Sequence, residues 1–178
     1  MSKLSKFYFK EDSDFLNSNQ KKFIENTIQG EHFPFYLNKG SVIGDGNASL
    51  FHVVKKRPED GGEWNNNAKE YFIDILNTFC SKNNIKYKQI IRCAVNLTFK
   101  NKDKKCPTHK DHTFNHKQLI LYLNNPLDKK STTILLKNNK IYKEIKPEKF
   151  KGVCFDNIEH YHYFPKKGHR LVLVYTFN

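Results

Sequence analysis

The nine residues at 106–114, CPTHKDHTF, carry the most specific chemistry in the chain. His109 and Asp111 stand two positions apart, and alternate residues of an extended backbone point the same way. The imidazole and the carboxylate can therefore converge on one metal ion. A further neutral imidazole from elsewhere in the fold would complete a set of two histidines and one carboxylate, which leaves open positions on ferrous iron.

A second group of candidate residues lies in the C-terminal segment GVCFDNIEHYHYFPKKGHRLVLVYTF. His160 and His162 follow a predicted strand, and Arg170 begins the final predicted strand after a Lys-Lys-Gly turn. If the strands on either side of this turn pair, a histidine and Arg170 come to the same end of the fold. A guanidinium in that place can bind a carboxylate through two parallel hydrogen bonds.

The elements that must position these residues are helices in the first part of the chain and strands in the second. Hydrophobic spacing predicts helices at 14–29 and 68–82. Strands are predicted at 49–54, 87–99, 117–124, 132–136, 140–145, 152–156 and 170–177, an extended segment at 31–38, and loops at 40–49 and 57–67. This order indicates an α+β fold in which a sheet or barrel is backed by the N-terminal helices. The loop at 57–67 is a candidate lid or a disordered insertion.

Length and composition narrow the class of protein. A chain of 178 residues fits a single domain over residues 1–178. No stretch approaches the ~18 apolar residues of a membrane span, and the N-terminal residues lack the apolar core of a signal peptide. We therefore expect a cytoplasmic protein, in the host cytoplasm if the chain is viral. The four cysteines show no CxxC spacing, so we expect free thiols.

The formal net charge is +13, from 31 Lys and Arg against 18 Asp and Glu. Such an excess favours contact with polyanions, because binding of phosphates releases counterions. Almost all of the excess is lysine that is dispersed along the chain, and asparagine is also abundant. A biased coding composition would produce the same charge, so both interpretations stay open.

The sequence resembles the Fe(II)- and 2-oxoglutarate-dependent dioxygenases, and among them the small phage- and virus-type, prolyl-hydroxylase-like members. The segments that carry the resemblance are, in chain order, FPFYLN, SLFHVV, IIRCAVNLT, THKDH with NHKQLILYLN, FKGVCFDNIEHYH and KKGHRLVLVYTF. The resemblance implies a double-stranded β-helix (a jelly-roll, cupin-like core) with Fe(II) at its mouth. It also implies 2-oxoglutarate and O2 as co-substrates, with ascorbate as a reductant.

The resemblance also implies roles for individual residues. His109 and Asp111 match the proximal metal ligands. His160 matches the distal ligand because Arg170 follows it by ten residues, and His162 is the alternative because the stretch before Pro165 is slightly shorter than in the family.

Two further positions match the family's co-substrate contacts. Arg170 matches the arginine that pairs with the C5 carboxylate of 2-oxoglutarate, and Asn96 lies where related enzymes place a polar contact to it. Two departures stand beside these matches. Leu121-Tyr122 replaces the two tyrosines of many hydroxylases, and DKKSTTILL replaces a glycine-rich segment.

The implied reaction is hydroxylation of a C–H bond on a protein or peptide side chain such as a prolyl residue, with release of succinate and CO2. The alternatives are oxidation or demethylation of a nucleic-acid base, and a non-catalytic jelly-roll binding module. The other histidines and Arg92 are interpreted as structural residues. His112 and His116 are expected to be neighbours of the metal or solvent-facing groups, and His32 and His52 to be core or edge residues. His169 is expected on the face opposite Arg170, and Arg92 in an ion pair.

Overall fold

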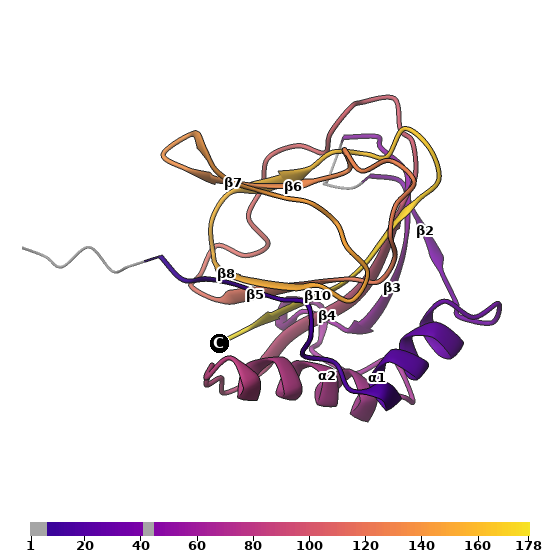
Figure 1. The fold of residues 1–178 in the computed structure, drawn as a ribbon, viewed down its shortest axis with the longest axis vertical. Helices are drawn as coiled ribbons and strands as arrows, with labels where there is room; N and C mark the ends of the chain where they lie inside the picture. Colours follow the sequence, from indigo (N-terminus) through magenta and orange to yellow (C-terminus); the bar gives the residue numbers. More distant parts are fainter. Residues whose placement is uncertain (1–6, 41–44) are drawn as a thin grey trace, which may run out of the picture.

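The computed structural model describes residues 7–40 and 45–178, which form two facing antiparallel sheets with helices on the outer side of one (Figure 1). The major sheet runs in the order β1 (Phe9–Asp12), β8 (Gly152–Asp156), β5 (Lys117–Tyr122), β10 (Arg170–Phe177), β4 (Ile90–Thr98), β3 (Ser49–Lys55) and β2 (Tyr36–Asn38). The minor sheet runs in the order β7 (Lys140–Ile145), β6 (Thr133–Lys137) and β9 (His160–His162). The expected α+β fold with a jelly-roll core is confirmed.

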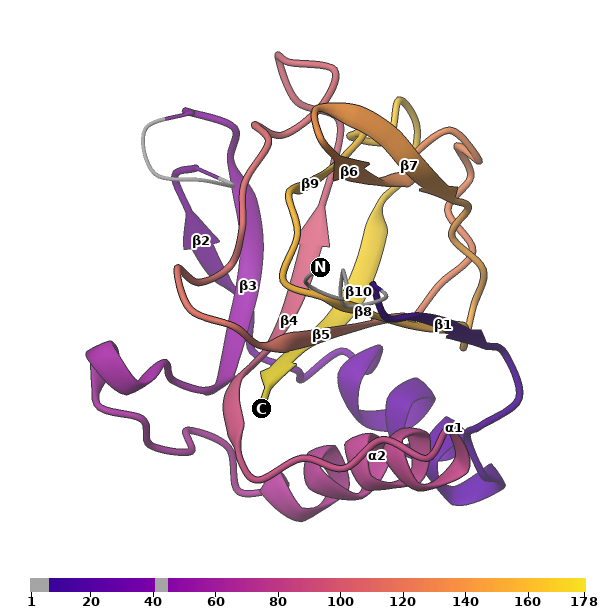
Figure 2. The same cartoon turned by 90° about the vertical axis from the view of Figure 1, so that its left-hand side faces the viewer.

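Two helical segments cover the outer face of the major sheet (Figure 2). Helix α1 (Ser18–Phe23) begins with a capping box between Asn17 and Gln20 and continues into a π-helical turn, η1 (Ile24–Ile28). Helix α2 (Lys69–Lys82) buries one apolar stripe against the sheet, consisting of Phe72, Ile75, Leu76, Phe79 and Cys80. The helices therefore seal one face of the sheet and leave the other face to the interior between the sheets.

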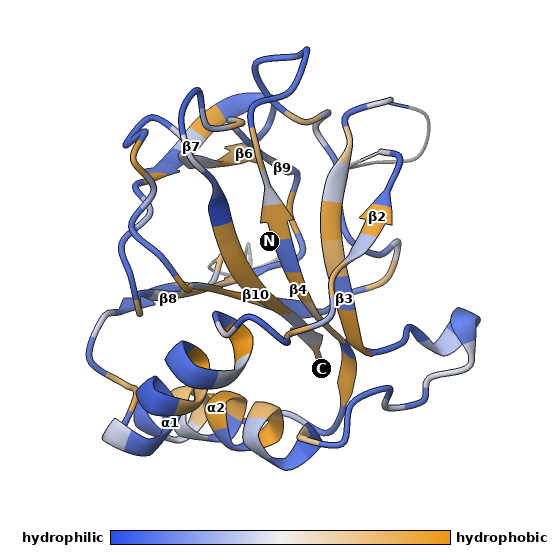
Figure 3. Cartoon of the chain, turned by 90° about the vertical axis from the view of Figure 1, so that its right-hand side faces the viewer, coloured by the Kyte–Doolittle hydropathy of each residue, from blue (hydrophilic) through white to orange (hydrophobic). Residues whose placement is uncertain are grey.

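Strand β10 shows how the two faces of the major sheet differ. Leu171, Leu173 and Tyr175 belong to the core under the helices, whereas Val172 and Val174 face the minor sheet. This alternation follows from the two-residue period of a strand. In Figure 3 the strand begins hydrophilic, at Arg170, and continues hydrophobic. Arg170 shares the inward face with Val172 and Val174, so its side chain is directed between the sheets.

The predicted strands and helices are confirmed at most positions, with two additions. Strand β1 is short, polar and at the sheet edge, and β9 has three residues, so neither carries a hydrophobic period long enough to predict. The predicted loop at 40–49 ends where β3 begins, and its residues 41–44 lie outside the described part of the chain. Among the described residues, no helix is both long enough and apolar enough to span a bilayer.

One expectation about the strands is wrong. The strands on either side of the Lys-Lys-Gly turn do not pair, because β9 pairs with β6 while β10 lies between β4 and β5. The turn carries the chain from one sheet to the other. The C-terminal histidines and Arg170 are therefore brought together across the interior and not by neighbouring strands.

Gly152 offers a test of the packing between the major sheet and the helices. A Cβ at this position would lie 2.8 Å from ring atoms of both Phe15 and Phe79. We predict that Gly152→Ala lowers the free energy of unfolding by about 1–3 kcal/mol, because backbone and rings must move apart. Urea denaturation measures the effect, and the cost should shrink in a Phe79→Leu background. An equal cost in both backgrounds would contradict this explanation.

Candidate active site

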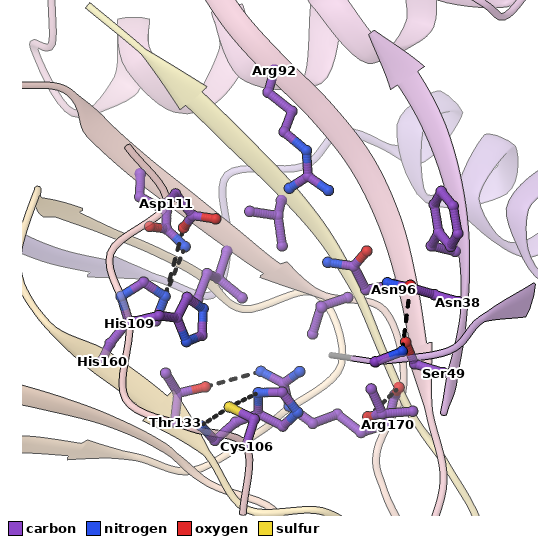
Figure 4. A pocket seen from close by; sticks show the side chains of 18 of the residues that line it. Asn38, Ser49, Arg92, Asn96, Cys106, His109, Asp111, Thr133, His160 and Arg170 are labelled. Carbon is purple, nitrogen blue, oxygen red and sulfur yellow. Dashed lines mark hydrogen bonds and ion pairs between the residues drawn. The ribbon is translucent and has the colours of Figure 1, made fainter. Parts of the chain in front are cut away.

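A cavity of about 740 Å³ lies between the two sheets and is lined mainly by polar side chains (Figure 4). Its lining includes every residue expected to bind metal or co-substrate: Asn96, His109, Asp111, His160 and Arg170, together with the alternative ligand His162. These residues come from strands β4, β9 and β10 and from the segment between β4 and β5. The structure thus gathers residues that are distant in the sequence around one space.

Backbone hydrogen bonds hold the segment that carries His109 and Asp111 against β9. The N–H of His109 donates to the carbonyl of His160 at 3.0 Å, and the N–H of His160 donates back to the carbonyl of His109 at 2.9 Å. The N–H of Cys106 likewise donates to the carbonyl of His162 at 3.0 Å. The segment therefore extends the minor sheet, although the sequence predicts no strand there.

This pairing places the three expected metal ligands side by side. The imidazole rings of His109 and His160 have centroids 4.6 Å apart. The Nε2 of His160 lies 3.6 Å from Oδ2 of Asp111, and that oxygen is buried without a hydrogen-bond partner among the described residues. A buried carboxylate oxygen without a partner is costly in a protein on its own. An ion at this point would supply the missing partner.

The hydrogen bonds of the two imidazoles determine which ring nitrogen is available. His109 Nδ1 lies 2.8 Å from the carbonyl of Pro107, and His160 Nδ1 lies 3.1 Å from the carbonyl of Ile158. A carbonyl can only accept, so Nδ1 carries the proton in each ring and Nε2 has the free lone pair. Histidines that bind metals commonly have this arrangement, in which the backbone fixes the ring orientation.

The charges around the site favour a neutral imidazole next to an ionised carboxylate. Burial lowers the pKa of His160 to about 4, although the nearby Asp111 opposes this shift. Burial alone would raise the pKa of Asp111, but its neighbours, His160 first and then Arg92, His109 and Arg57, outweigh burial and hold that pKa below its ordinary value. Both groups are therefore in the protonation state that a metal ion requires.

The three side chains do not form a closed metal cage as they stand. Within residues 7–40 and 45–178, no group of three or more His, Cys, Asp or Glu side chains is arranged to hold an ion. The amide nitrogen of Gln118 also approaches His160 Nε2, at 3.4 Å. Coordination would replace this weak contact. The donor set itself fits a ferrous ion, because it offers two imidazoles and one carboxylate.

His162, the alternative distal ligand, lies on the same side of β9 as His160 but is engaged differently. Its Nδ1 is 3.2 Å from the sulfur of Cys106, and the sulfur also accepts the backbone N–H of His162 at 3.2 Å. Burial, and next the charge of Arg170, hold the pKa of His162 well below its ordinary value. His162 is thus held by Cys106 near Arg170, and its Nε2 is buried without a partner among the described residues.

Arg170 reaches across the interior from the major sheet to the minor sheet. Its Nη2 donates to the hydroxyl of Thr133 on β6 at 2.9 Å, and its guanidinium lies over the ring of Tyr122, 5.4 Å from the centroid. The hydroxyls of Tyr122 and Thr133 are 2.7 Å apart. The Nε of Arg170 is buried without a partner among the described residues. The guanidinium is thus fixed in place by one of its five N–H donors, and the Nε–H is among those left for a ligand.

Several residues of the site do not stand out in the sequence. Thr133, Gln118 and Cys106 are ordinary residue types that gain importance only from their contacts with Arg170, His160 and His162. Arg57 and Arg92 also line the cavity. The expected structural ion pair of Arg92 is absent, because no hydrogen bond or ion pair joins it to any other residue that the structure describes. Inward alternation on β4, shared with Asn96, is the signal that could have found Arg92.

The remaining histidines agree with the expectations in part: His52 is in the core as expected, His32 is not, and neither His112 nor His116 faces solvent. His52 is buried between the carbonyl of Pro34 and the side chain of Asn66, whereas His32 is exposed. His112 is buried, and its Nε2 lies 2.8 Å from the hydroxyl of Thr176. His116 packs against His112, and His169 is exposed.

No protein-family profile matches the sequence, and no curated protein matches it. Solved structures match it over nearly its whole length. A 2OG-Fe(II) oxygenase family oxidoreductase from Burkholderia pseudomallei superposes with a TM-score of 0.76 at 14% identity, covering 96% of this chain and 84% of that chain. The chain has the fold of the 2OG-Fe(II) oxygenases.

Two prolyl hydroxylases also share this oxygenase fold. A prolyl-4-hydroxylase from Pseudomonas putida matches with a TM-score of 0.64 at 13% identity, covering 98% of this chain and 94% of that chain. A prolyl hydroxylase from Trichoplax adhaerens, solved with a hypoxia inducible factor peptide fragment, matches with a TM-score of 0.63 at 15% identity, covering 95% and 82%. At these identities the likeness establishes the architecture around the cavity.

Thr133 provides a test of how the oxygenase fold fixes Arg170. We predict that Thr133→Val lowers the free energy of unfolding by about 1–3 kcal/mol, because buried groups of Tyr122 and Arg170 lose their shared partner. The matched control is Thr132→Val, since the Thr132 hydroxyl is buried without a partner among the described residues. That variant should be neutral or stabilising in the same urea titration. Equal effects of both variants would contradict the proposed role of the Thr133 hydroxyl.

The buried histidines predict an acid-sensitive fold. Burial lowers the pKa of both His112 and His160 to about 4, compared with 6.5 for a free histidine. Between pH 6.5 and 4 the unfolded chain therefore binds more protons than the folded chain, and stability falls as the pH falls through this window. The loss amounts to at most about 1.4 kcal/mol per pH unit for each histidine.

Urea denaturation of the metal-free protein at pH 7, 6 and 5 measures this dependence. The slope of the free energy of unfolding against pH should be smaller in His112→Gln, because this variant lacks one of the titrating groups. Asp111 affects stability in a separate pH window. Its lowered pKa stabilises the folded state above about pH 4, and this stabilisation is lost as the pH falls below that value. A stability that is constant from pH 7 to 5 would contradict the prediction.

Proposed function

We propose that residues 1–178 form a single-domain Fe(II)- and 2-oxoglutarate-dependent dioxygenase that hydroxylates a C–H bond. The observation that carries this proposal is the group of two imidazole Nε2 atoms and one buried carboxylate oxygen, in a cavity that also receives a fixed guanidinium. The oxygenase fold supports it, because the group lies between the two sheets of that fold.

The proposed metal ligands are His109, Asp111 and His160. His160 is preferred over His162 because its Nε2 faces Asp111, whereas His162 is held by Cys106. The protein contributes fixed ring orientations through backbone carbonyls and an ionised carboxylate through the surrounding cations. Bound Fe(II) would supply the activation of O2 that oxidises 2-oxoglutarate to succinate and CO2 and hydroxylates the substrate.

Arg170 is the proposed anchor for the distal carboxylate of 2-oxoglutarate. Its free Nε is buried, and a carboxylate that meets a buried guanidinium forms charge-assisted hydrogen bonds. Thr133 and Tyr122 hold the guanidinium from one side, so little side-chain freedom is lost on binding. Asn96 lines the same cavity from β4, and its amide is proposed as a further polar contact to 2-oxoglutarate.

The proposed substrate is a side chain of a protein or peptide, such as a prolyl residue. Support comes from the two prolyl hydroxylases with the same fold, one of which was solved with a peptide fragment. The formal charge of +13 favours a nucleic-acid base as the second candidate. Salt-dependent binding to DNA or RNA would separate these two substrates. A binding module without catalysis is disfavoured because all the expected polar residues line the cavity.

Metal binding and turnover test the assignment of the ligands. We predict that Asp111→Ala and His160→Ala reduce Mn(II) affinity at least tenfold and abolish succinate release from 2-oxoglutarate with Fe(II) and ascorbate. His162→Ala should retain Mn(II) binding, because the imidazole that contacts Asp111 is that of His160, whereas the imidazole of His162 contacts Cys106. Calorimetry measures the Mn(II) affinity, and Arg170→Gln should weaken 2-oxoglutarate binding without loss of Mn(II).

The reverse pattern for the two histidines would assign the distal ligand to His162. No succinate above the level of Asp111→Ala, across peptide, amino-acid and nucleic-acid substrates, would count against an oxygenase. Retained binding of Mn(II) and 2-oxoglutarate without turnover would favour the binding module.

A further inference from the structure

The cavity has a second cationic end, opposite Arg170. In the register of the major sheet, Arg170 is opposite Thr98 of β4, while Arg92 of the same strand is opposite Thr176. The six steps of β4 from residue 92 to residue 98 correspond to about 20 Å of strand. Figure 4 shows Arg92 and Arg170 at opposite ends of the cavity, with Asn96 beside the space between them. The two arginines therefore serve different parts of the cavity.

The guanidinium of Arg92 points into the cavity without a partner in the described part of the chain. It is only partly exposed, and no hydrogen bond or ion pair joins it to another described residue. Burial is the largest influence on its pKa and lowers it. A guanidinium that is partly removed from water with its donors unused is costly for the fold alone. The position is explained if an anion occupies this end of the cavity.

Arg57 comes to the same end from the loop after β3. Its Nη2 lies 3.9 Å from Oδ1 of Asp111, and its Nη1 lies 3.9 Å from Glu59. Both separations are longer than a hydrogen bond, so neither carboxylate fully uses the guanidinium. The side chain is 33% exposed at the cavity mouth. Arg57 and Arg92 thus flank the side of Asp111 that faces away from Arg170.

A molecule of 2-oxoglutarate anchored at Arg170 cannot also use Arg92. The diacid spans about 5 Å between its carboxyl carbons, far less than the separation along β4. The proposed metal ligands lie between the two ends, so the Arg92 end is available to the second reactant. This assignment of the Arg92 end to the second reactant rests on the proposed function.

We propose that Arg92 and Arg57 bind an oxyanion, a carboxylate or a phosphate, on the primary substrate. The substrate is then an acidic molecule whose reacting carbon lies between this anion and the metal ligands. Arg92 makes the central contact because no hydrogen bond or ion pair joins its guanidinium to another described residue, whereas Arg57 already lies near Glu59 and Asp111 and makes a second contact. Planar guanidinium groups suit both oxyanions because each presents paired donors.

Small anions can probe this subsite before the substrate is known. Calorimetric titrations would use protein loaded with Mn(II) and 2-oxoglutarate, and separately the metal-free protein. The probes are N-acetylproline, its neutral match N-acetylprolinamide, and inorganic phosphate. We expect at least one of the two anions to bind ten times or more tightly than the amide. The anion that binds more tightly identifies the oxyanion of the substrate as a carboxylate or a phosphate.

Variants then locate the binding. We expect Arg92→Gln to lower the affinity for the anion at least tenfold, because a hydrogen bond to a charged group is lost. The loss of affinity in Arg57→Gln should be smaller. Arg92→Lys should retain part of the affinity. Lys137→Gln removes an exposed charge on the minor sheet and is the control for net charge. The melting temperature of ligand-free Arg92→Gln should change little, because removal of a buried cation is offset by the loss of its attraction to Asp111.

Three results would overturn the proposal. The amide could bind as tightly as both anions, or Arg92→Gln could leave anion affinity unchanged. Arg92→Gln could also weaken 2-oxoglutarate as strongly as Arg170→Gln does, which would place Arg92 in the co-substrate site. Failure of the wild-type protein to bind 2-oxoglutarate with Mn(II) would instead refute the proposed function, and the metal-free titrations would still decide whether Arg92 binds anions.

Discussion

The backbone pairing between His109 and His160 is the interaction on which the arrangement of the site depends. Two mutual hydrogen bonds hold the segment between β4 and β5 against β9, so a residue near position 109 is brought beside one near position 160. Without this pairing, Asp111 would belong to a surface loop, and its carboxylate would be hydrated. With it, the carboxylate lies beside the imidazole of His160 and loses water contacts that only a ligand can replace. The metal-binding potential of the site is thus a consequence of β-sheet pairing.

The sequence could predict much of this fold because its strands and helix α2 carry clear hydrophobic periods. Strands β7, β8 and β10 have the predicted bounds, since turn residues delimit each of them. The candidate site residues stand out in the sequence for a different reason, and their roles remain predictions. An H-x-D pair, a later histidine and an arginine ten residues after it form a pattern whose chemical types are uncommon together, and the cavity is lined by all four.

What the sequence could not predict depends on contacts between distant residues. The turn before Arg170 could join paired strands or carry the chain to the other sheet, and local spacing does not distinguish the two. Thr133 becomes part of the site only because β6 faces β10 across the interior, which places its hydroxyl against Arg170. For Arg92 the neighbouring residues suggested an ordinary apolar strand, and an ion pair was the natural expectation. Its inward direction follows from β4 being covered by helices on one face alone.

The distribution of charge within the cavity links these observations. Arg170 is satisfied in part by a neutral hydroxyl and an aromatic ring, neither of which neutralises it. Asp111 is the one carboxylate among the lining residues that the structure describes, and it lies between this arginine and the pair Arg57 and Arg92. Three guanidinium groups and one carboxylate in the same cavity leave an excess of positive charge inside a partly dry space. Such an excess is unfavourable in an empty protein and favourable once anions enter. The same electrostatic imbalance underlies both proposals, a keto-diacid at one end of the cavity and an acidic substrate at the other.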